Sequence, residues 1–217
     1  MENVTYTEEK HAVETIGGGS VVEGIGGAGA LVLSILGLIG LMPLMMASVA
    51  TIAAGGALLV GGGTLASRYM RILARTQEGY TRDIIGGGMA MESLCGVAGI
   101  VLGILSLLNI MPLTLLPVSA IILGAALLMA SGAMGRLAAM PIIGGGGQSH
   151  TVARDVLYAA SGSEVLVGAG AVVLGILALS GVAPLTLSLV AMLGIGTSVL
   201  LAGSSIAGRV FGSFALR

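Results

Sequence analysis

The sequence predicts an all-α integral membrane protein with six transmembrane helices, arranged as three repeated helical hairpins. Hydrophobic residues make up 56% of the 217 positions and charged residues only 9%, too few to cover a water-exposed surface. Three long stretches contain no Asp, Glu, Lys, Arg or His. Acidic, small and proline residues recur at matching positions of each stretch, which indicates an internal repeat.

The composition also excludes several classes of function. Nine Lys and Arg against ten Asp and Glu give a net charge of −1, so the chain has no basic footprint for nucleic acid. With no Trp, two Phe and four Tyr, it offers no aromatic platform for stacking bases or sugars. The single cysteine, Cys95, excludes a disulfide framework and a cysteine-rich metal site.

The uncharged stretches cover residues 24–67, 93–135 and 165–208, and each is 43 or 44 residues long. One spanning helix needs about 20 apolar residues, so each stretch has room for two. Near the middle of each stands a proline, which favours a turn over one very long helix. Because the stretches lack the alternating polarity of a membrane β-barrel, we expect three helical hairpins. The prolines are Pro43, Pro112 and Pro184.

Charged and glycine-rich segments separate the hairpins. We expect a cytoplasmic or interfacial N-terminal segment over residues 1–20 and a C-terminal tail over 210–217. Acidic residues precede the first apolar stretch, which is not the order found in a secretory signal peptide. The connections contain amphipathic stretches suited to interfacial helices and glycine clusters, such as Gly86 to Gly88, suited to hinges. The remaining boundaries are hairpin repeat 1 over 21–68, a connection over 69–88, hairpin repeat 2 over 89–136, a connection over 137–160, and hairpin repeat 3 over 161–209.

The distribution of positive charge predicts the orientation. All nine Lys and Arg lie outside the three uncharged stretches, and none lies at the proline-bearing tips. By the positive-inside rule, we expect a multi-pass protein of the inner (cytoplasmic) membrane with both termini in the cytoplasm. The tips, such as Leu41-Met42-Pro43-Leu44, are apolar. They either stop inside the far leaflet, are covered by another protein, or form plain tight turns at the lipid surface.

Each hairpin is bounded by a glutamate 20 positions before its proline and an arginine 24 or 25 positions after it. Twenty helical residues rise about 30 Å, close to the thickness of the hydrocarbon core. The glutamates are therefore expected at the inner interface, where the closing arginines can pair with them as anchors. These residues are Glu23, Glu92 and Glu164, and Arg68, Arg136 and Arg209.

A functional interpretation of the same glutamates stays open. Each lies on the small-residue face of its helix, so close packing would draw the three carboxylates together around an axis. Three such carboxylates repel one another and would hold a proton or a cation. That arrangement would suit a proton or cation path.

A stripe of small residues runs along the first helix of each hairpin. Positions 4, 7, 11 and 14 after the glutamate are small in every copy, and this spacing keeps them on one helix face. Small stripes let backbones approach closely in lipid, so we predict close helix packing and a pseudo-threefold bundle. The stripes are Gly27, Ala30, Ser34 and Gly37; Gly96, Gly99, Gly103 and Ser106; and Gly168, Ala171, Gly175 and Ala178, with a weaker stripe in the second helices that includes Gly55, Gly124 and Gly196.

No other residues assemble into a catalytic, cofactor or metal site. His11 and His150 are isolated and lack recognisable ligand spacing. Cys95 is expected to be a buried, inert thiol, since no histidine lies near it in the sequence. The glycine clusters lack the Lys-Ser/Thr ending of a phosphate-binding loop. We therefore expect no enzyme activity, no cofactor and no bound metal.

The hairpin pattern resembles the HdeD-like acid-resistance membrane proteins over most of the chain. The similar stretches run from Gly103-Ile104-Leu105 through Pro112 to Gly124, and from Gly175-Ile176-Leu177 through Pro184 to Gly196. The first repeat departs from this pattern with Ser34-Ile35-Leu36, and the glutamates in register are not a feature of that family. The resemblance implies a six-span fold, a tie to acid or envelope stress, and no catalytic residue.

These observations favour a non-enzymatic membrane protein that acts as a helix-packing scaffold or an accessory subunit of a membrane assembly. Its surplus of close-packing surface predicts a homo-oligomer or a membrane-protein partner, in addition to the lipid bilayer. The alternative is a small channel or transporter for protons, cations or a small solute that uses the three glutamates. A continuous polar path past the glutamates would favour transport, whereas an axis plugged by apolar residues would favour a scaffold.

Overall fold

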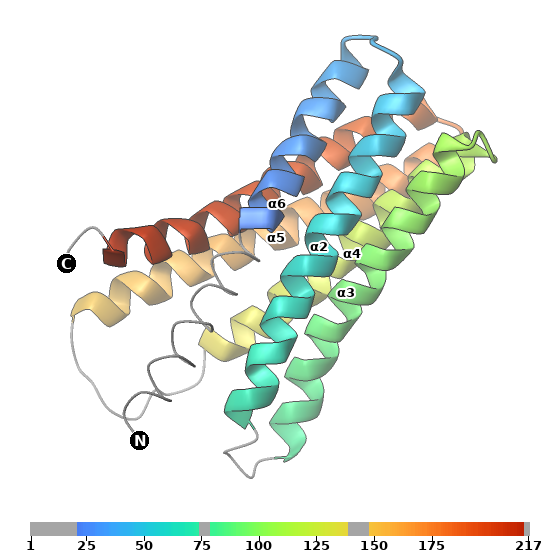
Figure 1. Ribbon diagram of the computed structural model, residues 1–217. Coiled ribbons are helices and arrows are strands. Elements are labelled where there is room, and N and C mark those ends of the chain that lie inside the picture. The colour runs from blue at the N-terminus through green and yellow to red at the C-terminus, as the bar shows by residue number, and fades with distance from the viewer. Residues whose placement is uncertain (1–20, 74–78, 139–147, 215–217) are drawn as a thin grey trace, which may run out of the picture.

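The computed structural model describes the backbone of residues 21–73, 79–138 and 148–214, and the side chains of residues 21–62, 91–131 and 162–204. All regular secondary structure in these residues is helical, which confirms the predicted all-α class. The helices are the N-terminal helix over Val21–Leu38, α2 over Pro43–Leu73, α3 over Gly79–Leu107, α4 over Pro112–Ala138, α5 over Gln148–Leu179 and α6 over Pro184–Phe214 (Figure 1).

Most of these helices are able to cross a membrane. Five contain an apolar stretch of 18 to 21 residues, which matches the length that a bilayer requires. These stretches belong to the N-terminal helix, α2, α4, α5 and α6, while α3 contributes a shorter one, Met91–Leu107. The chain is therefore a multi-pass membrane protein.

Three turns of one design connect the helices at one end of the molecule (Figure 1). Gly40, Asn109 and Gly181 adopt φ angles of 98°, 63° and 90°, a conformation that glycine and asparagine tolerate best. They end the preceding helices with a Schellman motif, in which the N–H of Leu41 donates to the carbonyl of Leu36 at 3.1 Å in the first turn. A proline then opens the next helix as its first residue, where a backbone N–H has no helical partner in any case.

The residue before each proline is held in a strained conformation. Met42, Met111 and Ala183 have φ angles of 39°, 40° and 39°, which cost a residue with a side chain about 1–2 kcal/mol. The carbonyl of this residue accepts the first bond of the new helix, as Met42 does from the N–H of Met46 at 3.0 Å. Because three different sequences adopt the same angle at the same place, the geometry of the turn imposes it.

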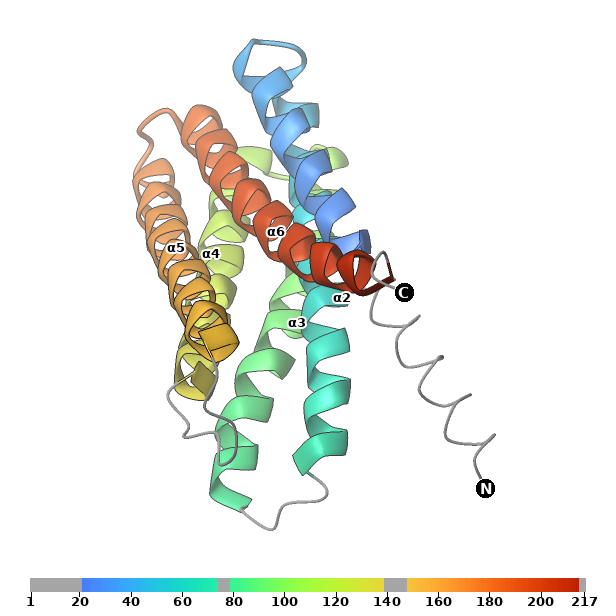
Figure 2. The same ribbon diagram turned by 90° about the vertical axis from the view of Figure 1, so that its left-hand side faces the viewer.

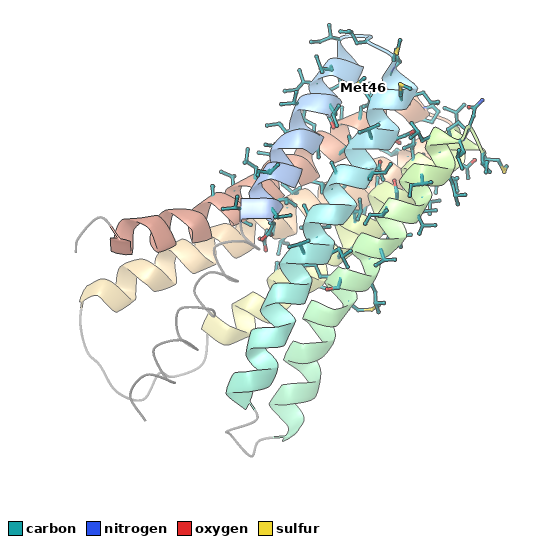
Figure 3. All side chains as sticks on the ribbon, in the orientation of Figure 1. Met46 is labelled. Atoms are coloured by element: carbon teal, nitrogen blue, oxygen red, sulfur yellow. The ribbon has the colours of Figure 1, made fainter. Side chains whose placement is uncertain are left out.

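The helices form an inner and an outer set. α2, α4 and α6 all contact one another and supply most of the buried apolar core. Among the labelled helices, the most extensive contacts join α2 to α3 and α4 to α5, and both views show these pairs side by side (Figures 1 and 2). The N-terminal helix, α3 and α5 leave large apolar side chains exposed (Figure 3). They include Val32, Val101 and Val173, each nine positions after a glutamate.

The long helices continue through segments that the sequence analysis assigned to connections. α2 reaches Leu73 and α3 begins at Gly79, so most of the predicted connection over 69–88 is helical. Gly86 to Gly88 lie within α3, where the sequence suggested a hinge. A glycine weakens a helix by about 1 kcal/mol relative to alanine but keeps its backbone hydrogen bond, so it need not break the helix. The predicted N-terminal segment, residues 1–20, lies outside the described residues.

Candidate functional site

All twelve residues of the predicted small stripes are buried. The contact between α3 and α2 shows why a small residue is needed. A Cβ atom added to Gly96 would lie 2.6 Å from the carbonyl oxygen of Gly55 and 2.6 Å from the backbone nitrogen of Leu59. The two backbones therefore approach so closely that only glycine fits at this crossing.

The same contact recurs at two other crossings. A Cβ atom on Gly168 of α5 would lie 2.7 Å from the carbonyl oxygen of Gly124 in α4. One on Gly27 of the N-terminal helix would lie 2.9 Å from the carbonyl oxygen of Gly196 in α6. In every case the outer glycine stands four positions after a glutamate, and the inner glycine stands twelve after a proline. The third crossing joins the first described helix to the last one.

Serine hydroxyls make polar contacts between and within the helices. The Oγ atoms of Ser48 in α2 and Ser106 in α3 are buried and lie 2.8 Å apart. Ser48 donates to the carbonyl of Leu44 at 2.8 Å, so Ser106 donates the hydrogen bond between the two hydroxyls. Ser198 differs, because its buried Oγ has no hydrogen-bond partner among the described residues. Neither the Ser48–Ser106 pair nor the isolated Ser198 hydroxyl was predicted from the sequence.

Apolar side chains fill the region where α2, α4 and α6 meet. Leu58, Leu127 and Val199 each stand 15 positions after a proline and are only 1%, 3% and 2% exposed. We call these three residues the apolar layer. They belong to one contiguous core cluster with the residues eleven positions after the prolines, which are Ala54, Leu123 and Ile195. Buried apolar side chains thus fill the contact between α2, α4 and α6 at this level.

The three glutamates predicted from the repeat lie close enough for their charges to interact. Glu23 and Glu92 are buried, and Glu164 is partly buried. Glu164 lies within electrostatic range of Glu23, and both Glu23 and Glu164 lie within that range of Glu92. We call these three residues the carboxylate cluster. Its members come from the N-terminal helix, α3 and α5, at the same distance before each turn.

Glu23 lies against a glycine of the inner helix α2. A Cβ atom on Gly61 would lie 2.9 Å from both Cδ and Oε1 of Glu23. Since Gly61 follows Leu58 by three residues, this carboxyl group lies about one helical turn beyond the apolar layer. Sequence reasoning missed Gly61, although a signal was present: the matching positions of α4 and α6 hold alanines, Ala130 and Ala202.

Several predicted site residues lie outside the described side chains. The proposed ion pairs of the glutamates with the closing arginines therefore stay a prediction. Cys95 is a free, partly buried thiol. Among the described residues, no group of three or more His, Cys, Asp and Glu side chains is placed to hold a metal ion. The undescribed side chains include Arg68, Arg136, Arg209, His11 and His150.

Comparison of the chain with family models, with curated proteins and with solved structures gave no match. The resemblance to HdeD-like proteins therefore stays a prediction.

Proposed function

We propose that the chain is a non-enzymatic protein of the cytoplasmic membrane that acts as a helix-packing scaffold or as an accessory subunit of a membrane assembly. The observation that carries this proposal is the apolar layer of Leu58, Leu127 and Val199. An ion that crossed this layer would lose its hydration, and no polar side chain of the layer could replace the lost water. Tight apolar packing at this level favours a scaffold over a conductor.

In this proposal the chain folds as three hairpin repeats with pseudo-threefold symmetry. The three glycine crossings support this symmetry, because the same positions of the repeat meet in each one. The three turns share their backbone angles, and Val32, Val101 and Val173 are similarly exposed at 53%, 49% and 55%. Such a ring would offer three similar apolar faces to lipid, to further copies of the chain or to a partner's helices, with both termini in the cytoplasm.

Reconstitution into liposomes tests the absence of conduction. A scaffold is expected to show no proton or cation flux above that of empty vesicles under an imposed gradient. Native mass analysis of the protein in nanodiscs is expected to show more than one copy or a co-purifying membrane protein. Flux through a protein that remains a single copy without partners would contradict the proposal.

A small channel or transporter is the second candidate, and the carboxylate cluster favours it. Buried acidic side chains in membrane segments often mark ion or proton pathways, and this cluster begins one turn beyond the apolar layer. In this candidate the layer is a gate that opens during transport. The test is the triple variant Leu58→Ala, Leu127→Ala, Val199→Ala.

The two candidates predict different results for that variant in liposomes. A gate predicts steady flux, which should fall when Glu23→Gln, Glu92→Gln and Glu164→Gln are added. A scaffold predicts lower stability without flux, whether or not the glutamates are present. The matched control replaces three outward-facing valines of similar size, by Val32→Ala, Val101→Ala and Val173→Ala, and should change neither flux nor folding strongly.

A further inference from the structure

The three pairs of helices that meet at the glycine crossings are not held together equally. Two of the pairs, α2 with α3 and α4 with α5, make a second close approach nearer the turns. A Cβ atom on Gly103 of α3 would lie 3.0 Å from the carbonyl oxygen of Ser48. One on Gly175 of α5 would lie 2.8 Å from the carbonyl oxygen of Pro117. The backbones of these pairs are therefore in contact at two levels, and such close packing is what holds helices together in lipid.

The third pair, formed by the N-terminal helix and α6, has a serine at the second level. Ser34 is buried and stands eleven positions after a glutamate, as Gly103 and Gly175 do. Because a real Cβ atom does not come as close to a carbonyl oxygen as these glycines allow, the backbone of α6 lies farther away here. One turn nearer the hairpin turn, the side chain of Leu189 fills the space, since a Cβ atom on Gly37 would lie 2.7 Å from its Cδ2.

The figures show the result of this difference. The N-terminal helix and α6 lie close together at the crossing of Gly27 and Gly196, and in both views they move apart toward the turns (Figures 1 and 2). These two helices are also not consecutive in the chain, whereas α2 is followed by α3 and α4 by α5. No connection therefore limits how far the N-terminal helix can move from α6.

The hydrogen bonds of the pairs point the same way. The hydroxyl of Ser34 donates to the carbonyl of Ala30 in its own helix at 2.7 Å, and this bond is kept when the N-terminal helix leaves α6. Separation of α2 from α3 would instead break the bond between the hydroxyls of Ser48 and Ser106, which lie 2.8 Å apart. A hydroxyl group without a partner is costly in hydrocarbon. The N-terminal helix and α6 are therefore the pair whose separation costs the least free energy.

We propose that the N-terminal helix and α6 form a lateral gate, which opens toward the bilayer at the turn end and pivots at their glycine crossing. The other two pairs stay closed, because each is held at two levels. Opening exposes Leu189 to the acyl chains, together with the small buried cluster that it forms with Ala47 and Leu116. The gate depends on the contacts between two helices and not on the apolar layer, so its failure would leave the proposed function unaffected.

Distances between spin labels measure the opening, and the repeat provides two matched controls. In a Cys95→Ala background, each labelled pair joins an isoleucine twelve positions after a glutamate to a valine six positions after a proline. The pairs are Ile35→Cys with Val190→Cys across the gate, Ile104→Cys with Val49→Cys across α3 and α2, and Ile176→Cys with Val118→Cys across α5 and α4.

The measurement is pulsed electron paramagnetic resonance in nanodiscs, with labelled protein diluted by unlabelled protein. The gate pair should give a distance distribution at least about twice as broad as that of either control, because a populated open state adds a longer distance. A gate distribution as narrow as those of the controls would overturn the proposal.

Substitutions at the second level test the cause of the opening. Ser34→Gly copies the residue of the other two pairs and lets α6 approach, so it should narrow the gate distribution toward the controls. Gly103→Ser should conversely broaden the distribution between α3 and α2. Ser34→Ala is the matched control, because it keeps the Cβ atom and removes only the hydroxyl, and it should leave the gate as broad as before. If Ser34→Gly has no effect, or if Ser34→Ala narrows the gate equally, the backbone separation does not set the opening and the proposal is wrong.

Discussion

Gly96 of α3 and Gly55 of α2 lie in direct backbone contact, and a Cβ atom on either would come within 2.7 Å of the other's carbonyl oxygen. In lipid the hydrophobic effect does not drive helices together, so close packing and hydrogen bonds must hold them. A contact of this kind is lost with the addition of a single methyl group. The three glycine crossings should therefore contribute strongly to the stability of the bundle.

Gly96→Ala should destabilise the protein by about 1–3 kcal/mol, because the added Cβ meets backbone atoms that cannot move aside cheaply. The free energy of unfolding can be measured by titration with SDS in mixed micelles. Gly56→Ala is the matched control in α2, since nothing lies within 4 Å of a Cβ atom there. This control should be neutral or stabilising by up to about 1 kcal/mol, because alanine is the better helix former. Equal effects of the two substitutions would show that helix contact is not what the glycine provides.

Gly61→Ala should displace the carboxyl group of Glu23, whose Cδ lies 2.9 Å from the position of the new Cβ. Because a flexible side chain can move, we expect a loss of only about 1 kcal/mol, at the low end of the cost of overpacking. In a Glu23→Ala background the same substitution should be neutral or favourable. A double-mutant cycle of unfolding free energies measures this difference, and a coupling energy near zero would refute the contact between the two residues.

Ser198→Ala should stabilise the protein by about 1 kcal/mol or more, because the buried hydroxyl of Ser198 has no partner in the described part of the chain. The matching positions of the inner helices already hold alanines, Ala57 and Ala126, which are 2% and 0% exposed. Ser188→Ala is the control, since the buried hydroxyl of Ser188 donates to the carbonyl of Pro184 at 2.7 Å. It should give no such gain. Thermal unfolding in detergent can rank the two variants, and a loss of stability in Ser198→Ala would reveal an unseen partner of the hydroxyl.

Ser48 and Ser106 should show a favourable coupling of about 0.6 kcal/mol, the average for hydrogen bonds between membrane helices. The measurement is a double-mutant cycle with Ser48→Ala, Ser106→Ala and the combined variant. The other two crossings provide a natural comparison, because Pro117 and Leu189 occupy the position that matches Ser48. If the two alanine substitutions are additive, the hydroxyl pair does not hold α2 to α3.

The sequence was informative where the same residue type recurs at the same position of each uncharged stretch. Pro43, Pro112 and Pro184 were expected to mark turns, and each is the first residue of a helix. The spacing of the small residues identified one helix face in every copy, and that face is buried. The three glutamates stand 20 positions before the three prolines, and the structure places them within electrostatic range of one another.

Other features could not be read from the sequence because lipid and protein interior select the same side chains. Leu58, in the buried core, and Val32, on the exposed surface, are both large and apolar, so hydropathy alone does not separate them. The connections were expected to leave the helices, yet α2 and α3 extend through most of residues 69–88. Charged residues mark the membrane boundary but do not end a helix, and no proline stands there to break it.

The most direct test of a closed ring of three hairpins is a cross-link between the N-terminal helix and α6, which no connection joins directly. A Cβ atom on Gly24 would lie 3.9 Å from the backbone nitrogen of Ser204, so cysteines at these two positions should react with one short bifunctional thiol reagent. In a Cys95→Ala background, Gly24→Cys with Ser204→Cys is expected to give an internally cross-linked monomer in lipid, while either cysteine alone gives none. Absence of this product, or its replacement by covalent dimers, would show that the ring is open and would contradict the proposed architecture.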